Sequence, residues 1–437
     1  MNLNREILRL AVPSIFANIT VPLVGMVDMA VAGHLPGTSA AALISGITIG
    51  AMLFDLLYWN FGFLRVGTGG LTAQAFGRGD ETGSILRRAL RIALLSGLAL
   101  IALQWVVVQL AFLLIECSPE VRQLATQYFY IRIWAAPATL SLFAFKGWFI
   151  GMQDTVRPMA ADLLVNTINI VASIVLGILI GFPGIALGTF LAQWSGFTYC
   201  VIAARRKYGV SLKKEAPDQV RDEGIDLFTL NRDLFLRSIG MIAVYIGFTV
   251  ISARFGDVLL AVSAILMKLL MFFSYFTDGF AYAGEALTGR FIGERSEDGV
   301  RSTIRQTFAW GMAMAALFML AYGLGGTPIL RLMTEDATVV DAGREFLPWL
   351  LLMPLIGCPA FVWDGIYIGA TASKDLRNST LLCAVGFFAV WFALERLMPT
   401  PQAAIHLLMA AYFVHLAIRA GYLTLRKKVI FSGISSQ

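Results

Sequence analysis

Six carboxylates and three basic side chains lie inside long apolar segments of this sequence. The acids are Asp28, Asp55, Asp162, Asp278, Glu285 and Asp364, and the bases are Arg65, Lys146 and Lys268. A charge at the centre of a bilayer costs at least about 2.5 kcal/mol, so ionisable residues in such segments commonly belong to an ion or substrate pathway. Six acids against three bases predict that an interior cavity would be negatively charged and would favour cations.

Asp28 stands apart because its own segment, residues 7–33, contains no basic residue after Arg9. Pro13 and Pro22 precede it, and each proline removes a backbone hydrogen bond, so the helix can bend or loosen there. A carboxylate removed from water takes up a proton more readily, and its charged and neutral forms favour different helix shapes. We therefore expect Asp28 to respond to H+ or another cation, with a structural hydrogen bond to a neighbouring helix as the alternative.

Polar side chains in two later segments could hydrogen-bond that carboxylate. They are Asn166 and Asn169 in segment 157–181, and Thr189 in segment 184–204. Isolated residues of these types also join membrane helices to one another, so both interpretations stay open. Asp278 and Glu285 lie two turns apart on one helix face, either lining a cavity or pairing with Lys268 or Arg65.

The elements that must position these residues are membrane helices. The chain is 58% hydrophobic and 14% charged, whereas soluble domains carry roughly 25% charged residues. A membrane-spanning helix needs about 20 apolar residues. Twelve such runs are present, at 7–33, 41–64, 90–115, 125–150, 157–181, 184–204, 233–254, 258–289, 302–325, 345–370, 378–395 and 402–424. The first run is too long and too polar for a cleavable signal peptide, so we expect a retained helix and an all-α integral membrane fold.

Cysteine and histidine usage argues against a metal site or an enzyme. The four cysteines are scattered without a C-x-x-C pair, and the three histidines lie far apart in the sequence. A membrane enzyme would need a nucleophile, an acid–base pair or a metal cluster near a membrane surface. We therefore expect no cofactor, no metal and no enzymatic activity.

The location of the 34 lysines and arginines predicts the topology. Most of them fall in alternate loops, and positive charge stays on the cytoplasmic side during insertion. Both termini are then cytoplasmic in a multi-pass protein of the bacterial inner membrane. The net charge of +6 reflects this topology, so nucleic acid is not an expected partner.

An internal repeat divides the chain into two halves. The sequence LTAQAFGRGDE from Leu71 matches LTGRFIGERSE from Leu287, and KGWFIGMQ from Lys146 matches DGIYIGAT from Asp364. The predicted parts are an N-terminal six-helix bundle at 1–204, a cytoplasmic linker at 205–230, a C-terminal six-helix bundle at 231–425 and a cytoplasmic tail at 426–437. Halves of like orientation can rock about a central cavity. Because Lys146 and Asp364 occupy matching positions, we expect them to neutralise one another.

Five segments resemble the multidrug and toxic compound extrusion (MATE) transporters, in particular the DNA-damage-inducible F (DinF) branch. They are PSIFANITVPLVGMVDMAVAGHL from Pro13, LRVGTGGLTAQAFG from Leu64, NRDLFLRS from Asn231, TDGFAYAGEA from Thr277 and WDGIYIGATASKDLRNS from Trp363. The resemblance implies two pseudo-symmetric bundles around a V-shaped cavity. It also implies export of organic cations or amphiphilic drugs in exchange for H+ or Na+, by a protein that we expect to be a monomer.

The resemblance also assigns site residues. Asp28 falls on the family's coupling carboxylate and Pro13 on the proline where that helix bends, while Asn169 and Thr189 match polar positions near the carboxylate. Relatives commonly carry a second aspartate where this chain has Ser173, which favours H+ over Na+ as the coupling ion.

Two further expectations follow from the resemblance. A second cation site in the C-terminal bundle would use Asp278, Glu285 and Asp364. The alternative function is a lipid-precursor flippase of the same superfamily, although such proteins tend to line their cavity with arginines and to add helices.

Overall fold

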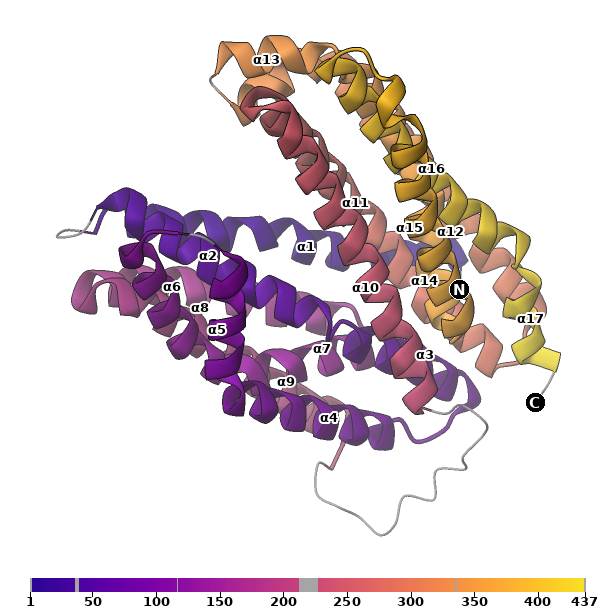
Figure 1. Cartoon of the computed structure of the whole chain (residues 1–437). Coiled ribbons are helices and arrows are strands. Elements are labelled where there is room, and N and C mark those ends of the chain that lie inside the picture. The colour runs from indigo at the N-terminus through magenta and orange to yellow at the C-terminus, as the bar shows by residue number, and fades with distance from the viewer. Residues whose placement is uncertain (1, 36–38, 116, 212–226, 335, 436–437) are drawn as a thin grey trace. The chain divides into compact units, whose positions relative to one another are not determined.

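The computed structural model describes residues 2–35, 39–115, 117–211, 227–334 and 336–435. These residues form helices joined by short turns (Figure 1). Eleven spans within them are long and apolar enough to cross a membrane. A bent pair, α4 (Gly83–Ala102) with α5 (Gln104–Leu114), makes a twelfth if it counts as one span. The predicted all-α membrane fold with twelve spans is therefore confirmed.

Residues 16–224 form one compact unit, which we call the N-terminal unit. After the end of α1, and besides α4 and α5, it contains α2 (Ala40–Trp59), α3 (Phe63–Arg78), α6 (Pro119–Arg132), α7 (Ala136–Gly151), α8 (Val156–Ile180) and α9 (Phe182–Tyr208). One turn of 3-10 helix, Ile133–Ala135, joins α6 to α7. Buried aromatic side chains fill the core, including the stacked rings of Phe54 and Phe129 with centroids 4.8 Å apart.

Residues 1–15 and 225–437 form the other compact unit, the C-terminal unit. Its helices are α10 (Leu227–Ser252), α11 (Asp257–Gly293), α12 (Glu297–Met333), α13 (Ala337–Arg344), α14 (Leu347–Gly369), α15 (Ser373–Leu394), α16 (Pro401–Leu425) and α17 (Lys428–Ser435). The segment predicted as a tail therefore includes a helix, and its Ile430 is fully buried. The predicted linker falls largely on residues 212–226, which lie outside the described residues.

Helix α1 (Leu3–Gly33) belongs to both units, whereas the predicted bundles assigned all of it to the N-terminal half. Its first part packs in the C-terminal unit, where a methyl group added to Gly279 would lie 2.8 Å from the Ala11 carbonyl oxygen. Arg290 also lies 3.4 Å from Glu6 there. The division of α1 falls after Ile15, two residues beyond Pro13.

Two pairs of glycines repeat the same helix contact in both units. Gly147 and Gly151 of α7 touch the backbone of α3, and Gly365 and Gly369 of α14 touch the backbone of α11. A side chain at any of the four positions would overlap the facing helix. These glycines lie in KGWFIGMQ and DGIYIGAT, so the repeat seen in the sequence is a repeat of helix packing.

Candidate functional site

Helices α1 and α8 pack in parallel and bring the predicted polar residues together. Near the start of the interface, the Asn166 amide donates to the Thr20 hydroxyl oxygen at 2.7 Å. Near its end, a methyl group added to Gly177 would lie 2.8 Å from Val31 Cγ1. These pairs share a separation of 146 positions along the chain. Asp28 and Ser173 have nearly the same separation along the chain, so Asp28 lies opposite Ser173 in the interface between α1 and α8.

Asp28 is 4% exposed and its Oδ1 has no hydrogen-bond partner in the described part of the chain. The Ser173 hydroxyl interacts with its carboxylate. That hydroxyl also lies 3.4 Å from the carbonyl oxygen of Ile185. Since a serine hydroxyl carries one proton, it can serve either acceptor, and it can shift toward Asp28 when the carboxylate is charged.

Two further oxygens come from Asn169 and Thr189. The Asn169 amide nitrogen donates to the Thr189 hydroxyl oxygen at 2.9 Å, which leaves the buried Asn169 Oδ1 without a partner among the described residues. Gly188 allows α9 to approach α8 at Ser173, since a methyl group there would lie 2.6 Å from the Ser173 backbone nitrogen. Three helices thus contribute a carboxylate, an amide and two hydroxyls, groups that can bind a proton or a small cation.

Arg132 is a functional candidate that the sequence analysis missed. It lies in the last turn of α6 and donates from Nη1 to the Tyr128 hydroxyl oxygen at 3.0 Å, with its guanidinium carbon 4.6 Å from the Phe54 ring centroid. Its charge interacts with both Asp28 and Asp55. Its location near a predicted loop concealed it, although the spacing of Tyr128 and Arg132 by one helical turn was a usable signal.

In the C-terminal unit, Asp364 is paired with two arginines. Arg237 of α10 lies 2.5 Å from its Oδ2, and Arg419 of α16 donates from Nε to its Oδ1 at 3.2 Å. Arg419 is 1% exposed and also interacts electrostatically with Asp278. The expected Lys146–Asp364 pair is therefore absent from the described contacts, and Lys146 instead lies 2.5 Å from Asp162 of α8.

The count of three bases inside the spans was incomplete. Arg132, Arg237 and Arg419 were counted with the loops and the tail, but all three lie within candidate spans. Asp233 and Asp375, which were not among the six acids, also lie within candidate spans and are buried. The charge count therefore does not by itself favour cations.

The other predicted site residues lie on several different helices and form no comparable cluster among the described residues. Glu285 is fully buried in α11, Asp278 lies two turns before it and is half-buried, and Lys268 of the same helix is exposed. Arg65 of α3 is half-buried, and Pro22 is exposed on α1. Across the described ranges, no group of three histidine, cysteine or acidic side chains could hold a metal ion.

Comparison with known proteins identifies the family. The MatE family model matches residues 13–175 and 234–392. The chain belongs to the MatE family of multidrug and toxic compound extrusion transporters. It is therefore a multi-pass membrane transporter of the multidrug and toxin efflux class, and the resemblance predicted from the sequence is confirmed.

Individual relatives agree with this assignment. The chain is 33% identical to DNA damage-inducible protein F of Escherichia coli, over 95% of this chain and 90% of that protein, which confirms the DinF branch. It is 24% identical to the probable multidrug resistance protein NorM of Thermotoga maritima, over 90% and 84% of the two chains. A crystal structure of a MATE in the bent conformation matches with a TM-score of 0.85 at 16% identity, covering 100% of this chain and 97% of that one.

Proposed function

We propose that this transporter is a proton-coupled antiporter that exports organic cations or amphiphilic compounds, with Asp28 as its coupling carboxylate. The observation that carries the proposal is the burial of Asp28 beside Ser173, Asn169 and Thr189. A buried carboxylate with few fixed partners can change its protonation state at modest cost, which a coupling residue requires.

Ser173 and Arg132 support an ionised Asp28 when no proton is bound. The serine can donate its proton to the charged carboxylate, and the guanidinium offers an opposite charge. Protonation removes both attractions, so these partners return to Ile185 and Tyr128. The substrate and the proton would then compete for the negative charge of Asp28 during alternating access.

The single carboxylate favours H+ over Na+ as the coupling ion. A proton needs only one carboxylate oxygen, whereas Na+ needs several oxygen ligands, and the nearby Arg132 guanidinium opposes the binding of either cation. The oxygens of Asn169, Thr189 and Ser173 could ligate Na+, so Na+ remains the second candidate.

Helix α1 provides a route from Asp28 to the C-terminal unit. The helix is shared between the two units, and its division near Ile15 lies between Asp28 and the N-terminus. Pro13 and Pro22 each lack a backbone N–H, and their rings crowd the carbonyl oxygens four residues earlier. A bend at either proline would transmit the protonation of Asp28 along the chain. We further propose that the protein acts as a monomer in the bacterial inner membrane with both termini in the cytoplasm.

The test is transport by the purified chain in proteoliposomes under an imposed pH gradient or an imposed Na+ gradient. We expect the pH gradient to drive ethidium counterflow, the Na+ gradient to have little effect, and Asp28→Asn to abolish the driven flux. Asp341→Asn, which neutralises an acid whose side chain is 69% exposed, is the matched control. Undiminished proton-driven flux through Asp28→Asn would overturn the proposal.

A further inference from the structure

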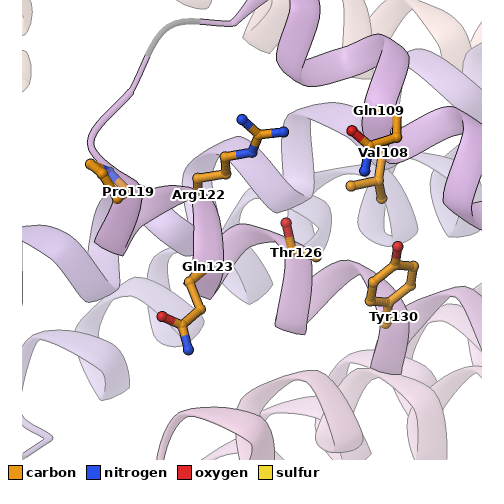
Figure 2. Close-up of a pocket in the computed structure, with 7 residues that line it drawn as sticks. All are labelled: Val108, Gln109, Pro119, Arg122, Gln123, Thr126 and Tyr130. Carbon is orange, nitrogen blue, oxygen red and sulfur yellow. The ribbon is translucent and has the colours of Figure 1, made fainter.

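A pocket of about 340 Å³ opens between α5 and α6, well apart from Asp28 along the chain. It is lined by Val108 and Gln109 of α5 and by Pro119, Arg122, Gln123, Thr126 and Tyr130 of α6 (Figure 2). Its volume is within the range of small-molecule sites.

The pocket exists because α5 turns away from α4. The two helices meet at Leu103 with a bend of 64°, which Figure 1 shows as α5 leaving the direction of α4. The repeat counterpart in the C-terminal unit, α12, continues as one helix from Glu297 to Met333. The bend is thus a feature of one half of the repeat, and it opens space beside α6 in that half.

Polar side-chain groups converge on the pocket between α5 and α6. Figure 2 shows the Arg122 guanidinium, the Gln109 amide and the hydroxyls of Thr126 and Tyr130 directed to one side of α6, whereas Gln123 points away. The seven lining residues include one cation and no acid. The Arg122 guanidinium carbon lies 5.0 Å from the Phe112 ring centroid.

The outer face of α5 is apolar and uncovered within its unit. Trp105 is 64% exposed, Leu110 is 57% exposed and Leu113 is 78% exposed. Tryptophan is typical of the boundary between headgroups and acyl chains. A molecule suited to both surfaces must carry a negative polar group for Arg122 and an apolar body for the face of α5.

We propose that this pocket binds the headgroup phosphate of an acidic phospholipid, with its acyl chains along Leu110 and Leu113. Arginine binds phosphate through two parallel hydrogen bonds, and Gln109, Thr126 and Tyr130 supply further donors. A zwitterionic headgroup would also need an acid for its ammonium group, and none of the described lining residues is acidic. By the predicted topology, the lipid comes from the outer leaflet.

Native mass spectrometry of the full chain, purified in detergent and titrated with phosphatidylglycerol, tests the proposal. Arg122→Gln should weaken phosphatidylglycerol binding about tenfold, as expected for hydrogen bonds to a charged group. Arg331→Gln removes the same charge from another exposed arginine, in the last turn of α12, and should leave binding unchanged. Equal phosphatidylglycerol binding by Arg122→Gln and the wild-type chain would overturn the proposal.

Two further measurements identify the ligand and exclude misfolding as the cause of weaker lipid binding. Gln109→Leu, which keeps the charge of Arg122, should weaken phosphatidylglycerol binding about threefold through the loss of one hydrogen bond. The wild-type chain should bind phosphatidylcholine more weakly than phosphatidylglycerol, and inorganic phosphate should not displace the lipid. Displacement by inorganic phosphate would assign the pocket to a soluble anion and would contradict a lipid site.

Discussion

The Ser173 hydroxyl of α8 interacts with the Asp28 carboxylate of α1. A serine supplies a hydrogen-bond donor and no charge, so Asp28 is the carboxylate of this contact between α1 and α8. The hydroxyl lies 3.4 Å from the Ile185 carbonyl oxygen, which offers it a second acceptor. The Ser173 hydroxyl can therefore change its acceptor when the charge of Asp28 changes, while it stays uncharged itself.

Ser173→Ala should move the pH of half-maximal transport upward by about one unit. Loss of a hydrogen bond to the charged carboxylate costs about 1.5 kcal/mol, and one pH unit corresponds to about 1.4 kcal/mol. The shift is upward because the ionised form loses support and Asp28 binds its proton at higher pH. The measurement is ethidium efflux from proteoliposomes across a pH series.

Ser195→Ala is the control for this substitution, since the Ser195 hydroxyl donates within α9 to the Leu191 carbonyl oxygen at 2.8 Å. An identical pH profile for Ser173→Ala and the wild-type chain would exclude a role of Ser173 at Asp28.

Asp364→Asn should destabilise the protein by about 3 kcal/mol or more, because it removes the carboxylate from the buried Arg419 guanidinium and the partly buried Arg237 guanidinium. A second substitution, Arg419→Met, should recover part of that loss by removing one of the two charges. Thermal unfolding in detergent measures both effects. A stability of Asp364→Asn equal to that of the wild-type chain would show that the pair with Arg237 and Arg419 contributes little.

Asp154 lies in the turn between α7 and α8, outside the spans, and accepts hydrogen bonds from Lys207 at 2.7 Å and Tyr208 at 2.6 Å. Burial alone would raise the pKa of Asp154, but the hydrogen bonds from Lys207 and Tyr208 outweigh it and hold the pKa below its ordinary value of 3.8. A lowered pKa stabilises the folded state above the ordinary value, and this contribution is lost as the pH falls through the folded-state pKa.

Asp154→Asn should therefore lower stability by about 2 kcal/mol near neutral pH, and the difference from the wild-type chain should narrow below about pH 4. Unfolding scans at several pH values check this prediction. Asp80→Asn, an acid whose side chain is 54% exposed, should show a much smaller effect. A deficit of Asp154→Asn that persisted undiminished in acid would contradict the assigned hydrogen bonds.

Gly365→Ala should destabilise the protein by about 2 kcal/mol, since the new methyl group would overlap the Ala281 carbonyl group of α11. Gly421→Ala is the matched control, because a methyl group there has nothing within 4 Å and alanine favours a helix. Thermal unfolding of the two variants, measured in parallel, tests this prediction. Equal stabilities of Gly365→Ala and Gly421→Ala would contradict the close packing of α14 against α11 at Gly365.

Hydropathy was sufficient to predict the spans. The internal repeat contains the glycines that pack α7 on α3 and α14 on α11, but their contacts were not predicted. A run of about 20 apolar residues has few alternatives to a membrane helix, and the paired glycines carry the repeat in their spacing. Asn166, Asn169 and Thr189 were predicted as hydrogen-bond partners of Asp28, and this stays a prediction. In the structure Asn166 donates to Thr20 and Asn169 donates to Thr189. Ser173, which interacts with Asp28, was not predicted as its partner.

The partners of the charged residues could not be predicted in the same way. Lys146 and Asp364 match in the repeat, yet each pairs within its own unit, because helix packing and not sequence position decides which side chains meet. Arg132 and Arg237 lie near the starts of the predicted spans 125–150 and 233–254, so the count along the sequence assigned them to loops. Charge balance inside a membrane protein therefore requires the structure.

The most direct test of proton coupling counts the protons released when ethidium binds to the purified chain in weakly buffered detergent solution. If substrate and proton compete for Asp28, the wild-type chain should release up to about one proton per bound ethidium, and binding should weaken as the pH falls. Asp28→Asn should bind ethidium without releasing protons. Equal proton release by Asp28→Asn and the wild-type chain would contradict the assignment of Asp28 as the coupling residue.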